Sequence, residues 1–352
     1  MAQGVASTPA PQQGYAAEDG PSEPRPQWKR DGYRRTYGAI DLGTNNCRLL
    51  VARPSAEGFT VIDAFSRIVR LGEGLTQSGR LSDEAMDRAV GALSICGDKL
   101  RRRNVSLSRS VATEACRRAA NGREFTDRVR EETGIALDII EPQEEARLAV
   151  LGCHKLLEPG DGPALIFDIG GGSTELVLVD QEDGTPRIRA WWSAPWGVVS
   201  LTESEGKEAL EGPDRVAAYK RMRERARHAF ARFATMLPEG RDGIRLLGTS
   251  GTVTTLASVH LALPSYDRRA VDGLHMPIAA MQTISSMIAG MDYAERSALP
   301  CIGTERADLV VAGCAILEAI IEIWPAQNLG VADRGIREGI LRSLMARDGW
   351  VL

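Results

Sequence analysis

The sequence of 352 residues lacks the signatures of several protein classes. Its six cysteines never form a Cys-x-x-Cys pair, and with only four histidines no spacing typical of a zinc site occurs. No apolar run approaches the roughly 20 residues that span a bilayer, and the N-terminus lacks the apolar core of a signal peptide. A chain of this length buries complete cores without disulfides. These absences predict a cytoplasmic protein with no membrane partner.

An excess of charge of one sign is also absent. The 43 Lys and Arg residues against 47 Asp and Glu residues give a net charge of −4, which argues against nucleic acid as the main partner. Apolar residues make up 43% of the chain, which is ordinary for a soluble globular protein. At roughly 150 residues per domain, the length predicts two domains.

The N-terminal segment has a different composition from the rest. Residues 1–36 hold five of the 17 prolines and are rich in Gln, Gly and Ala. Few apolar groups are present there to offset the entropy lost on ordering. We therefore expect 1–36 to be a disordered tail.

The remainder reads as two cycles of strands and helices. Strand-like runs at 37–43, 47–53 and 59–70 open the first cycle, and runs at 164–170, 174–180 and 187–192 open the second. We expect helices at 82–103, 143–157, 213–236, 251–262, 277–298, 304–324 and 336–347, the first of them capped by Ser82. The predicted division is a domain I of 37–157 plus 333–352 and a domain II of 163–332.

One short motif occurs twice. A buried strand ends in Asp-x-Gly and is followed by hydroxyl residues, once at Asp41–Thr44 and again at Asp168–Thr174. An internal repeat of this kind implies two similar α/β domains facing each other.

Three loops rich in glycine and hydroxyl groups follow apolar strands, at 41–46, 168–174 and 248–252. Glycine lets backbone N–H groups approach an anion closely, and a helix N-terminus behind such a loop favours phosphate. Any one of them alone would be read as an ordinary turn, but three together favour phosphate binding. The candidate substrate-binding residues in them are Asp41, Gly43, Thr44, Asn45, Gly170, Gly171, Gly172, Ser173, Thr174, Ser250, Gly251 and Thr252.

Several acidic residues could serve a metal or a water molecule. A carboxylate at the end of a buried strand, as at Asp168, is costly unless it is paired or bound to a metal, and Glu175 could face the same cleft. Such hard oxygen ligands suit Mg²⁺. Glu144 and Glu145 open a helix, where one of them could deprotonate an attacking water or both could merely complement the helix dipole. On the substrate side, Arg117 and Arg337 could pair with phosphate oxygens.

Taken together, the motifs resemble the exopolyphosphatase / guanosine pentaphosphate phosphohydrolase family, over about residues 37–347. DIGGGSTEL combined with EEARL is the specific part of the likeness. The segments that carry the resemblance are AIDLGTNNCRLLVA (39–52), ATEACRRAAN (112–121), IIEPQEEARLAVLG (139–152), IFDIGGGSTELVLV (166–179), GTSGTVTTLA (248–257) and RGIREGIL (334–341).

The resemblance implies a fold and a set of roles. The family belongs to the actin-like superfamily, which implies an α/β fold of two ribonuclease-H-like domains with a cleft between them. By this likeness Glu145 is the catalytic base and also a metal ligand, and Asp168 and Glu175 are the other metal ligands. The chain departs from many members in carrying Pro142-Gln143 before the glutamate pair, and it resembles the short, two-domain form.

The function that the resemblance implies is hydrolysis of a phosphoanhydride. We expect an exopolyphosphatase that releases terminal orthophosphate from inorganic polyphosphate with Mg²⁺, or with another divalent cation or K⁺, and that forms a homodimer. The alternative is a guanosine pentaphosphate phosphohydrolase, or a sensor of guanosine penta- and tetraphosphate in the stringent response. A kinase of the same superfamily would need an adenosine pocket and an acceptor base. A chaperone-like ATP switch would need a peptide-binding domain.

Overall fold

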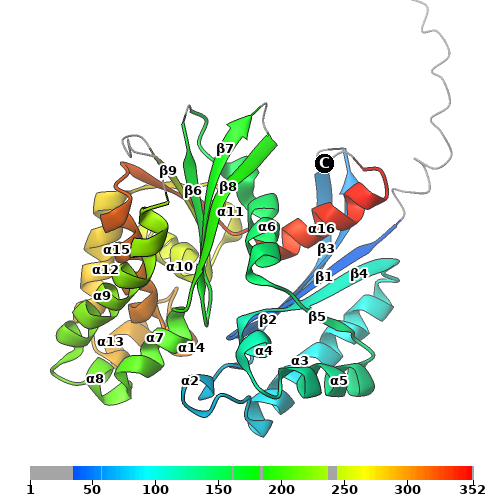
Figure 1. The fold of residues 1–352 in the computed structure, drawn as a ribbon, viewed down its shortest axis with the longest axis horizontal. Coiled ribbons are helices and arrows are strands. Elements are labelled where there is room, and N and C mark those ends of the chain that lie inside the picture. The colour runs from blue at the N-terminus through cyan, green and yellow to red at the C-terminus, as the bar shows by residue number, and fades with distance from the viewer. Residues whose placement is uncertain (1–34, 57, 161, 183–184, 237–243, 351–352) are drawn as a thin grey trace, which may run out of the picture.

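The computed structural model describes residues 35–350 except 57, 161, 183–184 and 237–243, and it contains two β-sheets with helices around and between them (Figure 1). Buried apolar side chains fill the space between each sheet and its helices, with the largest core cluster around the second sheet. No helix among these residues is both long enough and apolar enough to cross a membrane.

The first sheet has the strand order β3-β2-β1-β4-β5. Its first three strands pair antiparallel, and β4 and β5 then continue parallel to β1. Its strands are β1 (Tyr37–Leu42), β2 (Asn46–Ser55), β3 (Gly58–Ile68), β4 (Leu107–Ala112) and β5 (Leu137–Ile139), and its helices are α2 (Leu75–Ser78), α3 (Asp83–Arg102), α4 (Glu114–Arg118) and α5 (Gly122–Thr133).

The second sheet repeats this plan. Its order is β10-β11-β9-β6-β7-β8, so β8-β7-β6-β9-β11 matches β3-β2-β1-β4-β5, with the short β10 added at the edge. Its strands are β6 (Ala164–Ile169), β7 (Thr174–Glu182), β8 (Thr185–Ala194), β9 (Arg245–Thr249), β10 (His275–Pro277) and β11 (Asn328–Ala332). The predicted fold of two ribonuclease-H-like halves is confirmed.

The helices of the second half differ from the predicted ones mainly in their breaks. The segment expected as one helix over 277–298 is two helices, because Met291 adopts an extended conformation and Asp292 caps a new helix. The helices are α7 (Val198–Glu205), α8 (Lys207–Glu211), α9 (Arg215–Ala234), α10 (Gly251–His260), α11 (Arg268–Val271), α12 (Ile278–Gly290), α13 (Tyr293–Ala298), α14 (Gly303–Arg306) and α15 (Val310–Ile323).

Two helices lie between the sheets, α6 (Pro142–Cys153) and α16 (Ile336–Arg347) (Figure 1). They pack so closely that a Cβ atom at Gly152 would lie 2.0 Å from the carbonyl oxygen of Gly335. Helix α16 also packs on β1, and α6 packs on β7 and β8. The end of the chain therefore returns to the first half, while the predicted domain boundaries stay a prediction.

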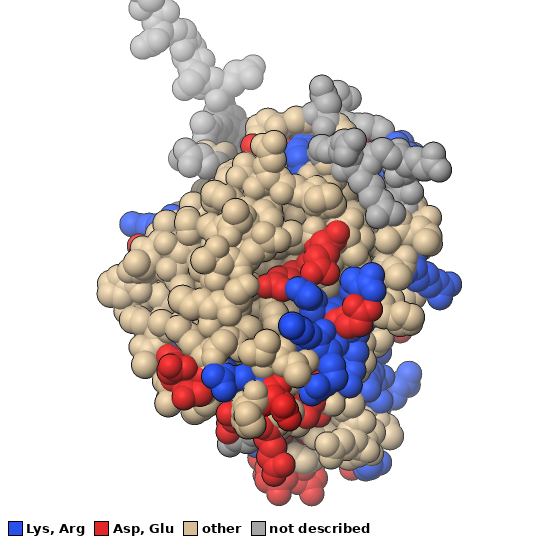
Figure 2. Space-filling model, turned by 90° about the vertical axis from the view of Figure 1, so that its left-hand side faces the viewer, with Lys and Arg blue, Asp and Glu red and all other residues tan. Residues whose placement is uncertain are grey.

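The outer face of the second half, which carries α9 and α12, has its charges in one band beside a broad uncharged area (Figure 2). Helix α12 contains no charged residue. In α9, Arg221 and Arg225 pair with Glu205, and Arg223 pairs with Glu318. Basic and acidic groups on this face therefore neutralise one another.

Most of the predicted tail, residues 1–34, lies outside the described residues. Its last two residues, Arg35 and Thr36, belong to the folded body. Arg35 forms an ion pair with Asp348 at 2.8 Å, and the hydroxyl of the buried Thr36 accepts a hydrogen bond from Arg53 at 3.2 Å. The predicted cap of α3 is present, since the Ser82 hydroxyl accepts from the backbone N–H of Ala85.

Candidate active site

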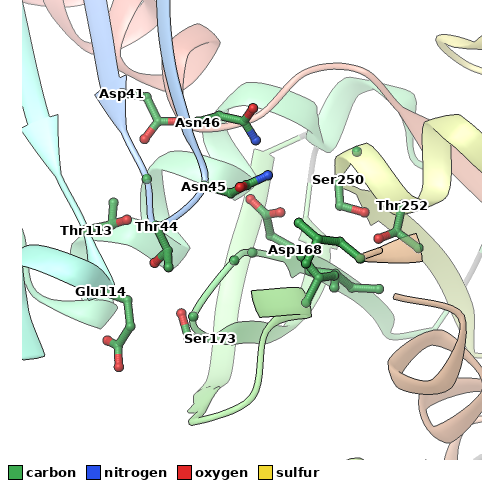
Figure 3. Close-up of a pocket in the computed structure, with 18 of the residues that line it drawn as sticks. Asp41, Thr44, Asn45, Asn46, Thr113, Glu114, Asp168, Ser173, Ser250 and Thr252 are labelled. Carbon is green, nitrogen blue, oxygen red and sulfur yellow. The ribbon is translucent and has the colours of Figure 1, made fainter. Parts of the chain in front are cut away.

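A cavity of about 140 Å³ lies where the two halves face each other. Its walls include segments 43–46, 170–173 and 250–252, the turns that follow β1, β6 and β9. Figure 3 shows Thr44 and Ser173 on one side of this pocket and Ser250 and Thr252 on the other. Because each turn follows the carboxyl end of a central strand, the repeated topology brings all three predicted loops to one place.

The first two loops touch each other. A Cβ atom at Gly172 would lie only 2.8 Å from the hydroxyl oxygen of Thr44, so a larger residue there would displace the Thr44 side chain. The start of α7 also holds the second loop in place, because the N–H of Val199 donates to the carbonyl of Gly171 at 2.8 Å. The glycines therefore permit a close contact between the halves.

Most of the predicted site residues line this cavity. Thr174 does not, and neither do Arg117 and Arg337. The Thr174 hydroxyl donates to the carbonyl of Trp196 at 2.7 Å, which ties β7 to the chain after β8. The predicted residues that line the cavity are Asp41, Gly43, Thr44, Asn45, Glu145, Asp168, Gly170, Gly171, Gly172, Ser173, Glu175, Ser250, Gly251 and Thr252.

The two glutamates at the start of α6 face different surroundings. Glu145 is buried and lines the cavity, and Arg117 donates to its Oε2 from both terminal nitrogens at 3.2 Å. Glu144 instead pairs with Arg109 and Arg147 outside the cavity, at 2.6 and 2.7 Å. The hydrogen bond from Arg147 is the main cause that lowers the pKa of Glu144. Only Glu145 is therefore placed to reach a molecule in the pocket.

Buried carboxylates converge on the cavity and repel one another. Burial raises the pKa of Glu145 well above its usual range, and the charge of Glu175 adds to the rise. Burial likewise raises the pKa of Asp168, helped by Glu175 and Asp41. Burial raises the pKa of Asp41 too, but there the charges of Arg48 and Arg337 oppose the rise. The charged forms of these carboxylates are thus unfavourable on their own, and a bound cation would favour them.

Glu175 has hydroxyl partners that the other acids lack. Its Oε1 accepts from Ser173 at 2.7 Å and from Ser193 at 2.9 Å. Burial raises the pKa of Glu175, and these hydrogen bonds oppose the rise because they favour the charged form. Glu175 is paired with Asp168 across the β6–β7 hairpin, so both carboxylates reach the same cavity.

The third loop opens α10. Ser250 caps this helix, its hydroxyl accepting from the N–H of Val253 at 3.1 Å. Since α10 runs from Gly251 to His260, the positive end of its dipole lies at the cavity. This geometry suits an anion such as a phosphoryl group.

The donor set suits a hard cation, although it forms no complete ligand cage. The Oδ1 of Asp41 is buried and has no hydrogen-bond partner in the described structure. Among the described residues, no group of three or more His, Cys, Asp or Glu side chains is placed to hold a metal ion, so Asp168, Glu175 and Glu145 are not assembled as three ligands. Mg²⁺ usually takes one or two carboxylates and completes its shell with water and substrate oxygens. The residues therefore fit such an ion, and its binding stays a prediction.

Some cavity residues escaped the sequence analysis. Arg48 pairs in register with Asp41 on the β1–β2 hairpin, and this register was the signal that could have found it. Glu114 follows β4 and accepts from Arg117 at 2.7 Å. Arg306 comes from α14 and donates to Thr255 at 2.9 Å, and no pattern near it in the sequence indicates this role.

Comparison with known proteins gives one consistent family. The model of the Ppx/GppA phosphatase family matches residues 50–348. Exopolyphosphatase 2 of Mycobacterium tuberculosis is 31% identical over 320 residues, which cover 87% of this chain and 97% of that protein. A guanosine-5'-triphosphate,3'-diphosphate pyrophosphatase of Aeromonas hydrophila is 27% identical, over 89% of this chain and 60% of that protein.

A solved structure agrees with these sequence matches. The crystal structure of the Aquifex aeolicus member of the Ppx/GppA family superposes with a TM-score of 0.73 at 28% identity, covering 90% of this chain and 99% of that one. The duplicated sheet, the facing Asp-x-Gly loops and the matched length all lead to the same assignment. The chain belongs to the Ppx/GppA phosphatase family.

Proposed function

We propose that this protein is an exopolyphosphatase, which releases terminal orthophosphate from inorganic polyphosphate by hydrolysis of a phosphoanhydride. The observation that carries the proposal is the placement of Glu145 in a cavity walled by three loops suited to phosphate. The relative named exopolyphosphatase 2 supports it, since the alignment covers 97% of that protein.

The phosphate chain would bind to the loops. Backbone N–H groups of 170–173 and the N-terminus of α10 supply partial positive charge, and Arg48 and Arg306 add full charges to the cavity wall. Phosphoryl transfer depends mainly on positioning and electrostatic stabilisation, which these groups provide.

Glu145 would act on the water. Its raised pKa makes it a stronger base than an exposed carboxylate, and Arg117 fixes its orientation. The water oxygen attacks the terminal phosphorus, its proton passes to Glu145, and the anhydride P–O bond breaks. The products are orthophosphate and a chain one phosphate shorter.

We propose Mg²⁺ as the cation of this site, with Asp168 and Glu175 as its protein ligands beside Glu145. When bound, the ion would supply positive charge to the terminal phosphoryl oxygens. The buried acids and the unpartnered Oδ1 of Asp41 support this choice. A homodimer and a cytoplasmic location stay predictions.

The second candidate is hydrolysis of guanosine pentaphosphate. The relative named guanosine-5'-triphosphate,3'-diphosphate pyrophosphatase favours it, but the alignment covers only 60% of that protein. The match to the Ppx/GppA phosphatase family disfavours a kinase.

The test is orthophosphate release from long polyphosphate, short polyphosphate and guanosine pentaphosphate, each with Mg²⁺. We expect long or short polyphosphate to be turned over fastest. Glu145→Gln should lower turnover by about 10²–10⁴-fold, the usual range for loss of a general base. Glu144→Gln is the matched control and should stay within a few-fold of the parent. Equal loss in both variants, or release from guanosine pentaphosphate alone, would refute the proposal.

A further inference from the structure

A second cavity, of about 420 Å³, lies on the other side of the segment that leads into α16. Its walls come from the start of β3, from α11 with the residue after it, and from α16 with Arg334, two residues before that helix. Arg334 faces this second cavity, whereas Ile336 faces the first. The two cavities therefore share one short stretch of backbone.

Positive charge dominates the second cavity. Four arginines and two acids line it, and each acid already has a partner. Asp272 pairs with Arg334 at 2.7 Å, and Glu338 pairs with Arg268 at 3.0 Å. Asp333, beside the cavity, also pairs with Arg268, at 3.2 Å, whereas Arg269 and Arg342 form no ion pair within the described part of the chain.

Arg342 is the unusual member of this set. Its side chain is 8% exposed, and its Nε has no hydrogen-bond partner in the described structure. Its guanidinium carbon lies 5.6 Å from the centroid of the Phe59 ring, over which it stacks. A buried charge is costly unless it is paired, so this guanidinium lacks the partner that burial requires.

The basic groups around this cavity have lowered pKa values. Burial lowers the pKa of Arg342, and the charge of Arg334 lowers it further, while the charge of Glu338 opposes the shift. The pKa of Lys155 is also lowered, first by burial and then by Arg342 and Arg334. Positive charges that repel one another at the edge of an open cavity favour an anion there.

We propose that this second cavity is a binding site for a phosphoryl anion, separate from the cleft and independent of the function proposed for it. Guanidinium groups match phosphate oxygens bidentately, and the two arginines without an ion pair, Arg269 and Arg342, are the groups left to bind them. The cavity is many times larger than the roughly 30 Å³ of a water molecule, so it admits either a single orthophosphate or part of a phosphate chain.

An anion in this site would connect the two halves. Arg268 and Arg269 belong to α11 of the second half, while Phe59 belongs to β3 of the first and Arg342 to α16, which packs on β1. Occupancy of the site therefore bridges elements that otherwise meet mainly through α6 and α16.

The test is isothermal titration calorimetry on the full chain with orthophosphate and, separately, with tripolyphosphate. A chelator is present so that no divalent cation helps anions into the cleft. The parent is compared with Arg342→Met and with Arg347→Met, which removes the same charge from an exposed position of the same helix. We expect Arg342→Met to weaken binding about tenfold or more and Arg347→Met to leave it within twofold.

The two ligands distinguish the source of the phosphoryl group. Tighter binding of tripolyphosphate supports a phosphate chain, and equal affinities support a single orthophosphate. Arg342→Met should melt no lower than the parent without ligand, since methionine removes a buried unpaired charge. If that variant does not fold, Arg269→Met, at an exposed position, is measured in its place and should weaken phosphate binding several-fold. Parental affinity in the folded Arg342→Met variant, which would place the anion in the cleft, overturns the proposal.

Discussion

The two Asp-x-Gly loops occupy equivalent places in the two halves, but their polar groups differ in hydrogen bonding. In the first loop, buried oxygen atoms of Asp41, Thr44 and Asn45 have no hydrogen-bond partner within the described structure. In the second loop, the Ser173 hydroxyl donates to Glu175 at 2.7 Å. The first loop therefore has unmet capacity for hydrogen bonds, whereas this hydroxyl of the second is already used.

Both loops are held through their backbones, the first by bonds from the N–H groups of Val69 and Gly72 to the carbonyls of Asn45 and Thr44, at 2.9 and 2.8 Å. The carbonyl of Gly170 accepts from the N–H of Val198 at 3.0 Å, and the carbonyl of Gly172 accepts from the Ser200 hydroxyl at 3.2 Å. Unsatisfied buried polar atoms are rare in folded proteins and often mark a binding role. The loops therefore differ in their side chains, and we expect the first loop to supply free polar groups to the ligand while the Ser173 hydroxyl of the second positions Glu175.

The largest loss of stability and turnover is expected from a substitution at the contact between the two loops. Gly172→Ala would place a Cβ atom 2.8 Å from the Thr44 hydroxyl and 3.0 Å from Glu114. Overpacking of this kind costs about 1–3 kcal/mol of stability, and turnover should fall because the loops separate. Gly251→Ala is the control, since the nearest recorded atom there lies 3.9 Å away, on Arg48. Urea unfolding measures both, and equal stability of the two variants would mean that the loops do not press on each other.

The position of these loops could be predicted from the sequence because each follows a central strand. The strand order of the two sheets then brings the carboxyl ends of β1, β6 and β9 together. The identity of Glu145 as the glutamate that lines the cavity could not be derived from composition, since Glu144 and Glu145 both lie in the first turn of α6. The family resemblance indicated it, and the structure agrees in placement.

Other parts of the site depend on which way side chains point. Thr174 was predicted to bind substrate, but it pairs with Ile169 while Glu175 pairs with Asp168, and successive strand residues face opposite sides of a sheet. The alternation was the signal that Thr174 and Glu175 face opposite sides of the sheet, and a substrate contact of Thr174 stays a prediction. Arg306 reaches the cavity from α14 through tertiary packing alone, and local sequence carries no signal for that.

A smaller effect, on the pH dependence of the free energy of unfolding, follows from the residue paired with each aspartate across its hairpin. Asp41 is paired in register with Arg48, whereas Asp168 is paired with Glu175. Because burial and Glu175 raise the pKa of Asp168 well above the usual 3.8, the folded protein holds a proton that the unfolded chain loses. The free energy of unfolding of the metal-free protein should therefore fall as pH rises above about 4, by about 1.4 kcal/mol per pH unit for each such group until its folded pKa is passed.

Replacing the two aspartates separately sharpens this difference. In the presence of a chelator, Asp168→Asn should flatten the fall in unfolding free energy between pH 5 and pH 8 more than Asp41→Asn does, because Arg48 and Arg337 already oppose the shift at Asp41. Asp127→Asn, at an exposed position, is the control and should keep the parental slope. Urea unfolding at the two pH values supplies the comparison, and a steeper slope in Asp168→Asn would contradict the assignment.

The smallest effect, and the most direct test of the division between the loops, compares Thr44→Val with Ser173→Ala. The Thr44 hydroxyl has no partner within the described structure, so valine should leave the free energy of unfolding unchanged or slightly higher while raising the KM for polyphosphate. Ser173→Ala removes the hydrogen bond to Glu175, so it should cost about 1 kcal/mol and raise the pKa of Glu175 further. Thermal or urea unfolding together with steady-state kinetics separates the two outcomes. If both variants lose the same stability, or if Thr44→Val keeps the parental KM, the first loop is as fully used within the protein as the second, and its free polar groups are not what the ligand binds.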